Sequence, residues 1–332
     1  MNLLVTGGAG FIGSNFIRFI LKKYPDYKII NLDKLTYAGN LNNLKDIEGN
    51  ANYQFEKGDI ADERTVKKIV RFKKIDAIIN YAAETHVDRS ILDPSAFIKT
   101  DIIGTYNLLE SLKEFALSKF IQISTDEVYG SIKNGKFTEV SPFLPNSPYS
   151  ASKASADLLC RSYVKTYNLP IIITHATNCY GPYQYPEKLI PLFITNLLER
   201  KKIPLYGQGQ NIREWLYVID HCRAIDFLLH KGQIGESYNI GSGVEKKNIE
   251  VTKSILSELG KNESAIEYVK DRPGHDLRYA LASKKINEAG WQAEYKFEDA
   301  IRETIHWYQN NNWWWKPLKS GEYLEYYKKQ YS

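Results

Sequence analysis

A glycine-rich segment near the N-terminus constrains the fold of this chain more than any other feature; it reads GGAGFIG over residues 7–13. The segment directly follows a short apolar run, residues 3–6, and opens a helical pattern. Glycines at these spacings permit a tight turn, a close approach of the backbone to a pyrophosphate and close packing of the helix on the strand. The phosphates then meet the free N–H groups at the start of the helix. A glycine-rich turn without a ligand is less favoured by this context. The segment therefore predicts a dinucleotide site formed by Gly7, Gly10, Phe11, Ile12 and Gly13.

Short apolar runs alternate with helical patterns over the first half of the chain. The runs are nearly continuous in Val, Ile and Leu, which is typical of parallel strands covered on both faces. We expect strands at residues 3–6, 28–33, 53–57, 77–82, 120–124 and 171–174. We expect helices at residues 11–24, 61–72, 93–115 and 147–167, with Asp93 as N-cap and Pro94 in the first turn of the third. This alternation predicts an α/β fold, a Rossmann-type doubly wound parallel sheet.

The alternation ends after Asn178, where Gly, Pro and Tyr become frequent around a helix expected at residues 189–200. A helix near 218–230 and a strand near 237–240 follow, and we expect them to return to the sheet. We predict a dinucleotide-binding domain of residues 1–178 plus about 216–240. The remaining residues, about 179–215 and 241–332, are expected to form a smaller, interleaved C-terminal substrate lobe.

Composition excludes several classes of protein. The 332 residues include 44 basic and 39 acidic ones, and a net charge of +5 is too diluted for a nucleic-acid-binding protein. No apolar run approaches the roughly 18 residues of a membrane span, and the N-terminus does not resemble a signal peptide. Three widely spaced cysteines, Cys160, Cys179 and Cys222, exclude a complete disulfide framework and a CxxC metal site. We expect a cytoplasmic protein that needs no metal.

Acidic side chains at two strand ends favour NAD as the dinucleotide. Asp33 lies about 20 residues beyond the last glycine, where a carboxylate accepts hydrogen bonds from the adenosine ribose and repels a 2′-phosphate. The adjacent Lys34 weakens this argument, and Asp33 could instead cap its loop. Asp59 and Ile60, after the third strand, are expected near the adenine, although a solvated strand-end Asp is nearly as compatible with the sequence.

A Tyr-x-x-x-Lys pair, Tyr149 and Lys153, falls on one face of a predicted helix. The ammonium group, helped by an oxidised nicotinamide ring, is expected to lower the pKa of the phenol, so that a tyrosinate acts as a base near neutral pH. Such a pair is common on exposed helices, but here it accompanies a dinucleotide motif and Thr125. Together a hydroxyl, a Tyr and a Lys can bind and deprotonate an alcohol.

Two adjacent carboxylates, Asp126 and Glu127, directly follow Thr125 at the end of a buried strand. Oxidation of a sugar at C4 acidifies the hydrogen at C5. Glu127 could remove that proton while a protonated Asp126 delivers one to the departing C6 hydroxyl. Opposite roles require environments that separate the two pKa values. The alternative is that both acids only cap the next turn.

These motifs resemble the extended short-chain dehydrogenase/reductase superfamily and, within it, the nucleoside-diphosphate-glucose 4,6-dehydratases. The resemblance spans about residues 1–282, and the Asp-Glu pair after Thr125 is its most specific element. The matching segments are GGAGFIGSNF, LDKLTYAGNL, YAAETHVDRS, STDEVYG, SPYSASKASAD, NCYGPYQYPEKLIP, REWLYVIDHC and DRPGHDLRYA. The resemblance implies an NAD-dependent lyase that forms a 4-keto-6-deoxy sugar for deoxysugar synthesis such as the rhamnose route.

The resemblance also implies roles for particular residues. The catalytic set would be Thr125, Asp126, Glu127, Tyr149 and Lys153. The NAD site would further include Asp33, Lys34, Thr36, Asp59, Ile60, Ala82, Ala83 and Thr100. The nucleotide-sugar site would include Thr85, Asn178, Glu187, Lys188, Leu189, Pro204, Tyr206, Arg213, Asn248, Arg272 and His275, with the two arginines on the pyrophosphate. A homodimer joined through the helices near 94–115 and 147–167 is also implied.

Some features depart from the resemblance or leave alternatives open. His175 and Cys179 replace the Arg and Asn expected at these positions, and we expect both to lie at the mouth of the nucleotide site. The run Trp313–Trp315 is expected to pack the C-terminal tail rather than to form a surface groove. A nucleotide-sugar 4-epimerase, which needs no Asp-Glu pair, and a non-catalytic NAD-sensing module are the alternative functions. The choice between thymine and uracil stays open.

Overall fold

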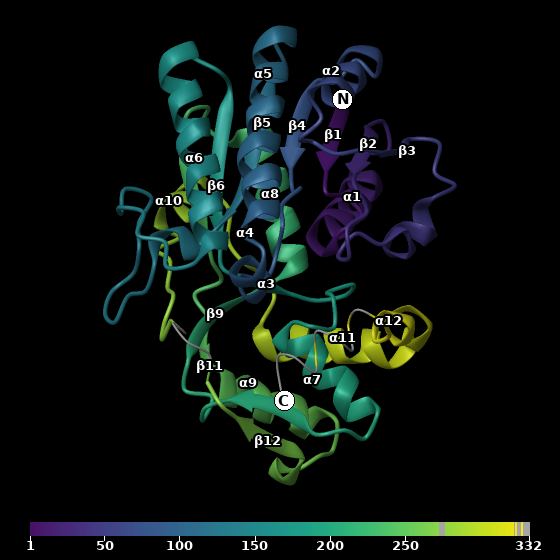
Figure 1. Ribbon diagram of the computed structural model, residues 1–332, viewed down its shortest axis with the longest axis vertical. Coiled ribbons are helices and arrows are strands. Elements are labelled where there is room, and N and C mark those ends of the chain that lie inside the picture. The colour runs from purple at the N-terminus through teal and green to yellow at the C-terminus, as the bar shows by residue number, and fades with distance from the viewer. Residues whose placement is uncertain (272–275, 322, 324–326, 328–332) are drawn as a thin grey trace.

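A seven-stranded parallel sheet forms the centre of the upper part of the molecule in Figure 1, as the sequence predicts. The computed structural model describes residues 1–271, 276–321, 323 and 327, so the predicted site residues Arg272 and His275 lie outside the described residues. In spatial order the strands are β10 (Ser237–Ile240), β6 (Ile171–Ala176), β5 (Lys119–Thr125), β4 (Ala77–Asn80), β1 (Asn2–Thr6), β2 (Lys28–Asp33) and β3 (Tyr53–Lys57).

Helices cover both faces of this sheet. Residues alternate between the faces along each strand, so on β1 the side chains of Leu3 and Val5 join one apolar cluster and Leu4 joins another. The first cluster includes side chains of α1 (Phe11–Lys23) and α8 (Val218–Lys231). The second includes those of α2 (Glu63–Phe72), α5 (Thr105–Phe115) and α6 (Pro148–Tyr167). Burial on both faces explains why the strands lack the polar alternation of a half-exposed sheet.

The segment predicted as one helix over 93–115 is interrupted, which corrects that prediction. It consists of α4 (Pro94–Phe97), a π-helical segment η2 (Ile98–Gly104) and α5. Asp93 caps α4 as expected, because its side chain accepts a hydrogen bond from the Ser95 N–H at 3.1 Å. A short helix α3 (Val87–Leu92) precedes this segment. The wider π-helical turn buries Thr100 and Asp101 near the edge of the sheet.

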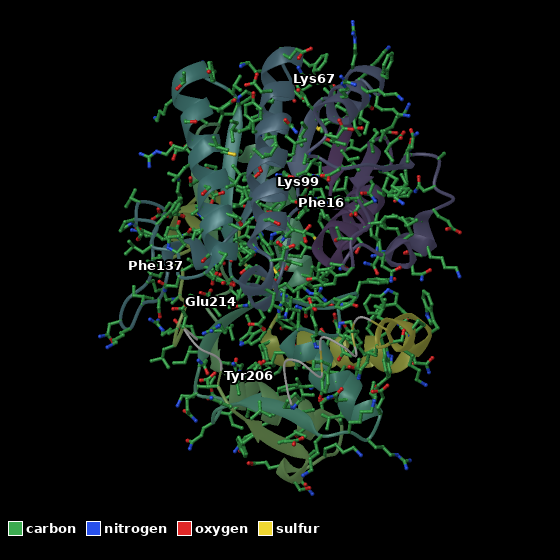
Figure 2. The ribbon with its side chains drawn as sticks, viewed as in Figure 1. Phe16, Lys67, Lys99, Phe137, Tyr206 and Glu214 are labelled. Atoms are coloured by element: carbon green, nitrogen blue, oxygen red, sulfur yellow. The ribbon has the colours of Figure 1, made fainter. Side chains whose placement is uncertain are left out.

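The lower part of the molecule in Figure 1 contains two small sheets and most of the C-terminal helices. One sheet has the order β11 (Glu245–Lys247), β9 (Ile212–Tyr217), β7 (Asn178–Tyr180), and the other pairs β8 (Ile203–Tyr206) with β12 (Ile266–Val269). The remaining helices are α7 (Leu189–Leu198), α9 (Asn248–Glu258), α10 (Lys284–Ala289), α11 (Phe297–Asn310) and α12 (Asn312–Leu318). In Figure 2, Tyr206 lies in this lower part and Glu214 lies where it joins the upper part.

One apolar cluster runs from the α1 and α8 face of the large sheet into α7, α9 and α11, so the two parts share a core. Strand β10 returns to the large sheet beside β6. The division into a dinucleotide-binding domain and an interleaved lobe remains our proposal.

Among the described residues, no helix is long and apolar enough to cross a membrane.

Other element boundaries fall close to those predicted, with one informative difference. The strand expected at 77–82 ends at Asn80, because Tyr81 and the residues after it leave the sheet to line a cavity. Three short 3-10 helices complete the described part of the chain: η1 (Leu41–Ile47), η3 (Asp126–Tyr129) and η4 (Glu263–Ala265).

Candidate active site

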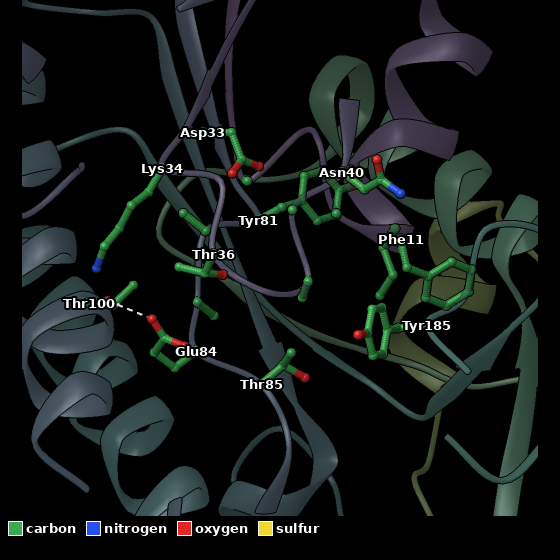
Figure 3. A pocket seen from close by; sticks show the side chains of 18 of the residues that line it. Phe11, Asp33, Lys34, Thr36, Asn40, Tyr81, Glu84, Thr85, Thr100 and Tyr185 are labelled. Carbon is green, nitrogen blue, oxygen red and sulfur yellow. Dashed lines mark hydrogen bonds between the residues drawn. The ribbon is translucent and has the colours of Figure 1, made fainter. Parts of the chain in front are cut away.

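A cavity opens at the carboxyl ends of β1 and β4, where the order of the strands along the sheet reverses. Open α/β sheets bind their ligands at such a switch point. Every residue predicted to bind the cofactor lines this cavity, from the glycine-rich turn to Tyr149 and Lys153 on α6. Figure 3 shows Asp33 at the top of the view, with the Lys34 side chain extending down toward Thr100 and Glu84. The structure thus brings together predicted cofactor residues that lie up to 146 positions apart, from Gly7 to Lys153.

Two glycines have roles that a larger residue could not fill. Gly7 has a φ of +65°, in the left-handed region that L side chains rarely adopt. A Cβ on Gly13 would lie 2.5 Å from the Gly7 carbonyl oxygen, so the start of α1 packs directly on the turn. The turn and the helix are therefore as close as a pyrophosphate site requires.

Asp33, which is 8% exposed, orients the turn as well as facing the cavity. Its Oδ2 accepts a hydrogen bond from the Ala9 N–H at 2.9 Å, and its Oδ1 accepts one from the Leu35 N–H at 2.8 Å. Burial raises the pKa of this carboxyl, and the two N–H donors oppose the rise. Each oxygen keeps a lone pair for a ribose hydroxyl. Lys34 places its Nζ 3.2 Å from Asp59 Oδ2, so its charge is partly neutralised there.

The Tyr149 and Lys153 side chains enter the cavity from the first turns of α6. Lys153 Nζ donates to the Ile123 carbonyl oxygen at 2.7 Å, which fixes its position against β5. The predicted lowering of the Tyr149 pKa relies in part on the charge of an oxidised nicotinamide ring, so it stays a prediction; in the protein by itself the balance is different. Burial, helped by the charges of Glu127 and Asp101, raises that pKa well above its ordinary value, and a hydrogen bond with Thr125 opposes the rise.

The predicted acid pair occupies the 3-10 turn η3 at the end of β5. Thr125 caps this turn by accepting a hydrogen bond from the Glu127 N–H at 3.3 Å, and its Oγ1 lies 3.2 Å from Asp126 Oδ1. Asp126 is 2% exposed, and its Oδ2 has no hydrogen-bond partner within the described part of the chain. Burial, together with the charges of Glu127 and Glu214, raises the Asp126 pKa well above its ordinary value. Glu127 is half-buried.

These environments can keep Asp126 protonated beside a more accessible Glu127. That is the difference between acid and base that opposite roles require. Over the described residues the cavity lining reaches Ser124 but does not include residues 125–127.

Three residues predicted to bind the nucleotide sugar line the same cavity: Thr85, Glu187 and Lys188. The Glu187 carboxylate is held by neighbouring side chains. Its Oε1 accepts from the Tyr37 hydroxyl at 3.0 Å and its Oε2 lies 3.4 Å from Arg89 Nη2. The Arg89 guanidinium lies over the Tyr37 ring at 3.5 Å.

The other described residues predicted to bind the sugar nucleotide lie outside the lining of this cavity, on the lower sheets and helices: Asn178, Leu189, Pro204, Tyr206, Arg213 and Asn248. Arg213, on β9, is buried, and its Nη2 donates to the Asp276 carbonyl oxygen at 2.9 Å. Its guanidinium lies 4.4 Å from the centre of the Tyr279 ring. The roles of these residues stay predictions.

His175 does not lie at the mouth of a nucleotide site, which corrects that expectation. It is buried on β6, where Nδ1 lies 3.0 Å from the Tyr129 hydroxyl and Nε2 lies 3.3 Å from Asp157 Oδ2. Asp157 also accepts a hydrogen bond from Ser124 Oγ at 2.6 Å. His175 therefore belongs to a buried polar chain behind the end of β5. Cys179 is half-buried, with its Sγ 3.6 Å from the Thr177 carbonyl oxygen.

Several cavity residues were missed by the sequence reasoning: Asn40, Asn43, Tyr81, Glu84, Tyr183, Gln184, Tyr185, Trp314 and Leu318. Glu84 follows two predicted residues directly and bonds weakly to Thr100 at 3.5 Å, as the dashed line in Figure 3 shows. Continuing the segment after β4 by one residue would have found it. For Trp314 and Leu318 no local motif gives a signal.

In residues 1–271 and 276–321, no group of three or more His, Cys, Asp or Glu side chains is arranged to hold a metal ion.

A parallel sheet, a glycine-rich dinucleotide turn and a Tyr-x-x-x-Lys pair at the same sheet edge define a dehydrogenase-like enzyme of the short-chain type. The chain belongs to the GDP-mannose 4,6 dehydratase family, whose family model matches residues 4–304.

Its relatives define the subgroup. The chain is 49% identical to a dTDP-glucose 4,6-dehydratase of Streptomyces niveus over 97% of both chains. It is 54% identical to the dTDP-glucose 4,6-dehydratase of Bacillus anthracis, solved in complex with NAD, with a TM-score of 0.91 over 96% of this chain and 100% of that one. A UDP-glucose 4-epimerase of Thermotoga maritima is 29% identical, with a TM-score of 0.88 over 94% of this chain and all of the other.

Proposed function

We propose that this protein is a hydro-lyase that converts dTDP-glucose to dTDP-4-keto-6-deoxyglucose and water with NAD as a retained cofactor. The observation that carries the proposal is the pair Asp126 and Glu127 in unlike environments beside Thr125 and Tyr149. A 4-epimerase needs no such pair. The relatives named dTDP-glucose 4,6-dehydratase support the same choice, because they match nearly the whole chain at about half identity.

The cavity residues fit NAD. The turn at Gly7 and the start of α1 suit a pyrophosphate, the free lone pairs of Asp33 suit a ribose, and Ala82, Ala83 and Thr100 also line the cavity. When bound there, NAD would supply the temporary hydride store that oxidation at C4 and reduction at C6 require. A site that has to store a hydride during each turnover should hold its cofactor tightly.

The protein's own groups move the protons. Tyr149, as the tyrosinate that Lys153 and the oxidised ring of bound NAD would favour, takes the proton of the C4 hydroxyl, and Thr125 donates a hydrogen bond to the oxygen at C4. Glu127 then removes the C5 proton, and protonated Asp126 gives its proton to the departing C6 hydroxyl, which leaves as water. When the hydride adds at C6, Glu127 returns a proton to C5, and exchange of that proton with solvent places solvent hydrogen there. The buried, uncharged state favoured at Asp126 supports its role as the acid, since an ionised carboxyl could not donate.

The diphosphate and the thymine base would bind beyond the sugar, toward the lower sheets. Thr85 and Lys188 line the cavity and would contact the glucosyl diphosphate, with Arg213 and Asn248 farther along. The choice of thymine over uracil rests on the names of the relatives, because one methyl group is worth only about 1–3 kcal/mol in a pocket.

The test is incubation of the purified protein with dTDP-glucose, and separately with UDP-glucose, in D2O without added NAD. We expect loss of one water from the thymidine nucleotide, solvent deuterium at C5 and substrate-derived hydrogen at C6. A product of unchanged mass with inverted C4 would favour the epimerase. Binding of NAD without any turnover of either sugar would favour a non-catalytic NAD-sensing module.

A homodimer and a cytoplasmic location belong to the same proposal. Large apolar side chains are exposed on the two helical regions predicted to join the subunits: Ile98, Ile103, Tyr106 and Leu158. Exposed apolar patches of this kind mark association surfaces. A reducing compartment suits the three cysteines, all of which are free.

A further inference from the structure

The C-terminal helix α12 carries three consecutive tryptophans and follows the part of the chain that the family model matches, residues 4–304. The three rings have different surroundings. Trp314 is 2% exposed and lines the cofactor cavity, while its neighbour Trp313 is 46% exposed. Leu318, one helical turn after Trp314, lines the same cavity. The predicted packing role is confirmed for Trp314 and Trp315, but Trp314 also forms part of a binding site.

A chain of hydrogen bonds joins Trp314 to the glycine-rich turn. Trp314 Nε1 donates to Asn43 Oδ1 at 2.7 Å, and Asn43 Nδ2 donates to the Ala9 carbonyl oxygen at 2.7 Å. The Ala9 N–H in turn donates to Asp33 Oδ2 at 2.9 Å. A side chain near the end of the sequence is therefore connected, through one amide, to the backbone between the pyrophosphate turn and the ribose-binding carboxylate.

The Asn43 side chain is well suited to connect the Trp314 indole to the glycine-rich turn. Both of its polar atoms are engaged, so Trp314 fixes which end of the amide faces Ala9. All of these groups are buried, and a buried hydrogen bond is costly to leave unmade. Removal of the indole donor would therefore loosen the amide and, with it, the turn.

The helix is also fastened on either side of Trp314. The Trp314 ring packs edge-on against Tyr183, whose ring centre lies 5.7 Å away and whose backbone has a strained φ of +67°. Trp315 Nε1 donates to the Tyr308 carbonyl oxygen at 2.8 Å. Just beyond the helix, the buried Lys319 Nζ donates to Glu199 Oε2 at 2.7 Å. These contacts hold α12 against the cavity.

We propose that α12 is a cofactor-retaining element: Trp314, acting through Asn43, holds the Ala9 backbone in the conformation that binds the dinucleotide. The proposal rests on NAD being the ligand of this cavity. Trp314 is a positioning residue and a wall of the site, and it takes no part in proton transfer. Its expected effect is on how long NAD stays bound during and between turnovers.

The test compares Trp314→Phe with the matched control Trp313→Phe. The first keeps a buried ring and removes the Nε1 donor, and the second changes the same residue type one position away at an exposed site. NAD release is measured by loading each protein with radiolabelled NAD and diluting it into excess unlabelled NAD. We expect release from the Trp314→Phe protein to be about fivefold faster, the factor that corresponds to one ordinary hydrogen bond. Release from the control should change less than about twofold.

A second variant separates the hydrogen-bond chain from packing. Asn43→Asp keeps an acceptor for the Trp314 indole but loses the Nδ2 donor to Ala9, so it should also release NAD several-fold faster. Unchanged release from both Trp314→Phe and Asn43→Asp would overturn the proposal, provided that both proteins unfold at the wild-type temperature without NAD. If Trp314→Phe does not fold, unchanged release from Asn43→Asp alone would overturn it. A wild-type protein that binds no NAD would instead refute the proposed function.

Discussion

Asp101 provides a sharp test of the electrostatics beside the active site. Its carboxylate lies in the π-helical segment η2 and joins two other elements, since Oδ1 accepts from the Glu84 N–H at 3.1 Å and Oδ2 accepts from Ser152 Oγ at 2.6 Å. Burial raises its pKa to about 6, although Lys153 and the Ser152 hydrogen bond lower it. Glu84 also faces it and adds to the rise. The group is thus an acid that titrates close to neutral pH.

The pKa shift fixes both the sign and the size of its effect on stability. The rise from 3.8 to about 6 means that the folded protein holds this proton more tightly than the unfolded chain. Asp101 therefore stabilises the fold most below about pH 4, and this contribution is lost as the pH rises through about 6. At about 1.4 kcal/mol per pKa unit the full span is about 3 kcal/mol. Between pH 4.5 and 7.5 about 2 kcal/mol of it should be seen.

The assay is urea unfolding of the wild type and of Asp101→Asn at several pH values, without ligand. Asparagine has a similar shape and does not titrate, so the difference between the two free energies of unfolding isolates the acid. We expect the wild type to lose about 2 kcal/mol relative to Asp101→Asn as the pH rises from 4.5 to 7.5.

The matched control is Asp93→Asn, a change in the same part of the chain. The Ser95 hydroxyl and backbone N–H lower the pKa of the exposed Asp93 carboxyl, so the stability it contributes is lost as the pH falls. Its pH dependence should therefore have the opposite sign. The free energy of unfolding of the wild type relative to Asp101→Asn should fall as the pH rises. If it stays constant or increases with pH, the argument that burial raises the Asp101 pKa more than Lys153 lowers it is refuted.

Three further predictions concern the reaction and the assembly. Glu127→Gln should abolish deuterium incorporation at C5. Asp126→Asn should keep some of that exchange, but its rate of water elimination should fall by roughly 10²–10⁴-fold. NMR follows both steps, and equal effects of a variant on the two steps would contradict the separate roles. Tyr149→Phe should lower kcat by a similar factor with the NAD content of the purified protein unchanged, as measured by absorbance of the released cofactor; a loss of NAD instead would make Tyr149 a binding residue. Ile103→Glu should convert the proposed dimer to monomers in light scattering, whereas Tyr268→Glu, an equally exposed change on β12, should not; a dimer that survives the first change would move the interface elsewhere.

The sequence predicts the cofactor half of the site well because its residues lie at strand ends. In a parallel sheet all carboxyl ends meet at one edge, so Gly7, Asp33 and Ala82 are brought together by topology alone. Contacts between distant segments have no such rule. Nothing near residue 314 indicates that its indole would reach Asn43, and nothing near His175 indicates burial behind β5.

Residue spacing also does not predict how deeply a side chain is buried or which charges surround it. The spacing of Tyr149 and Lys153 places them on one face of α6, but it gives no measure of how deeply the phenol is buried. In the protein by itself burial raises the Tyr149 pKa, so the predicted lowering depends on the bound cofactor as well as on Lys153. The π-helical turn at η2 is a similar case, because a helical pattern of apolar residues does not record one widened turn.

The geometry of η3 explains how two adjacent carboxyl groups can have opposite protonation states. Successive residues of a 3-10 helix point about 120° apart, so a strand that ends in such a turn sends neighbouring side chains in different directions. Asp126 points into the interior beneath β5 and is 2% exposed, and Glu127 stays half-buried. Since the charge of Glu127 also raises the cost of ionising Asp126, the more buried acid keeps its proton. The proposed acid and base roles are therefore consistent with the turn that Thr125 caps, and a substitution that unwinds this turn should impair both proposed roles even with both carboxyl groups retained.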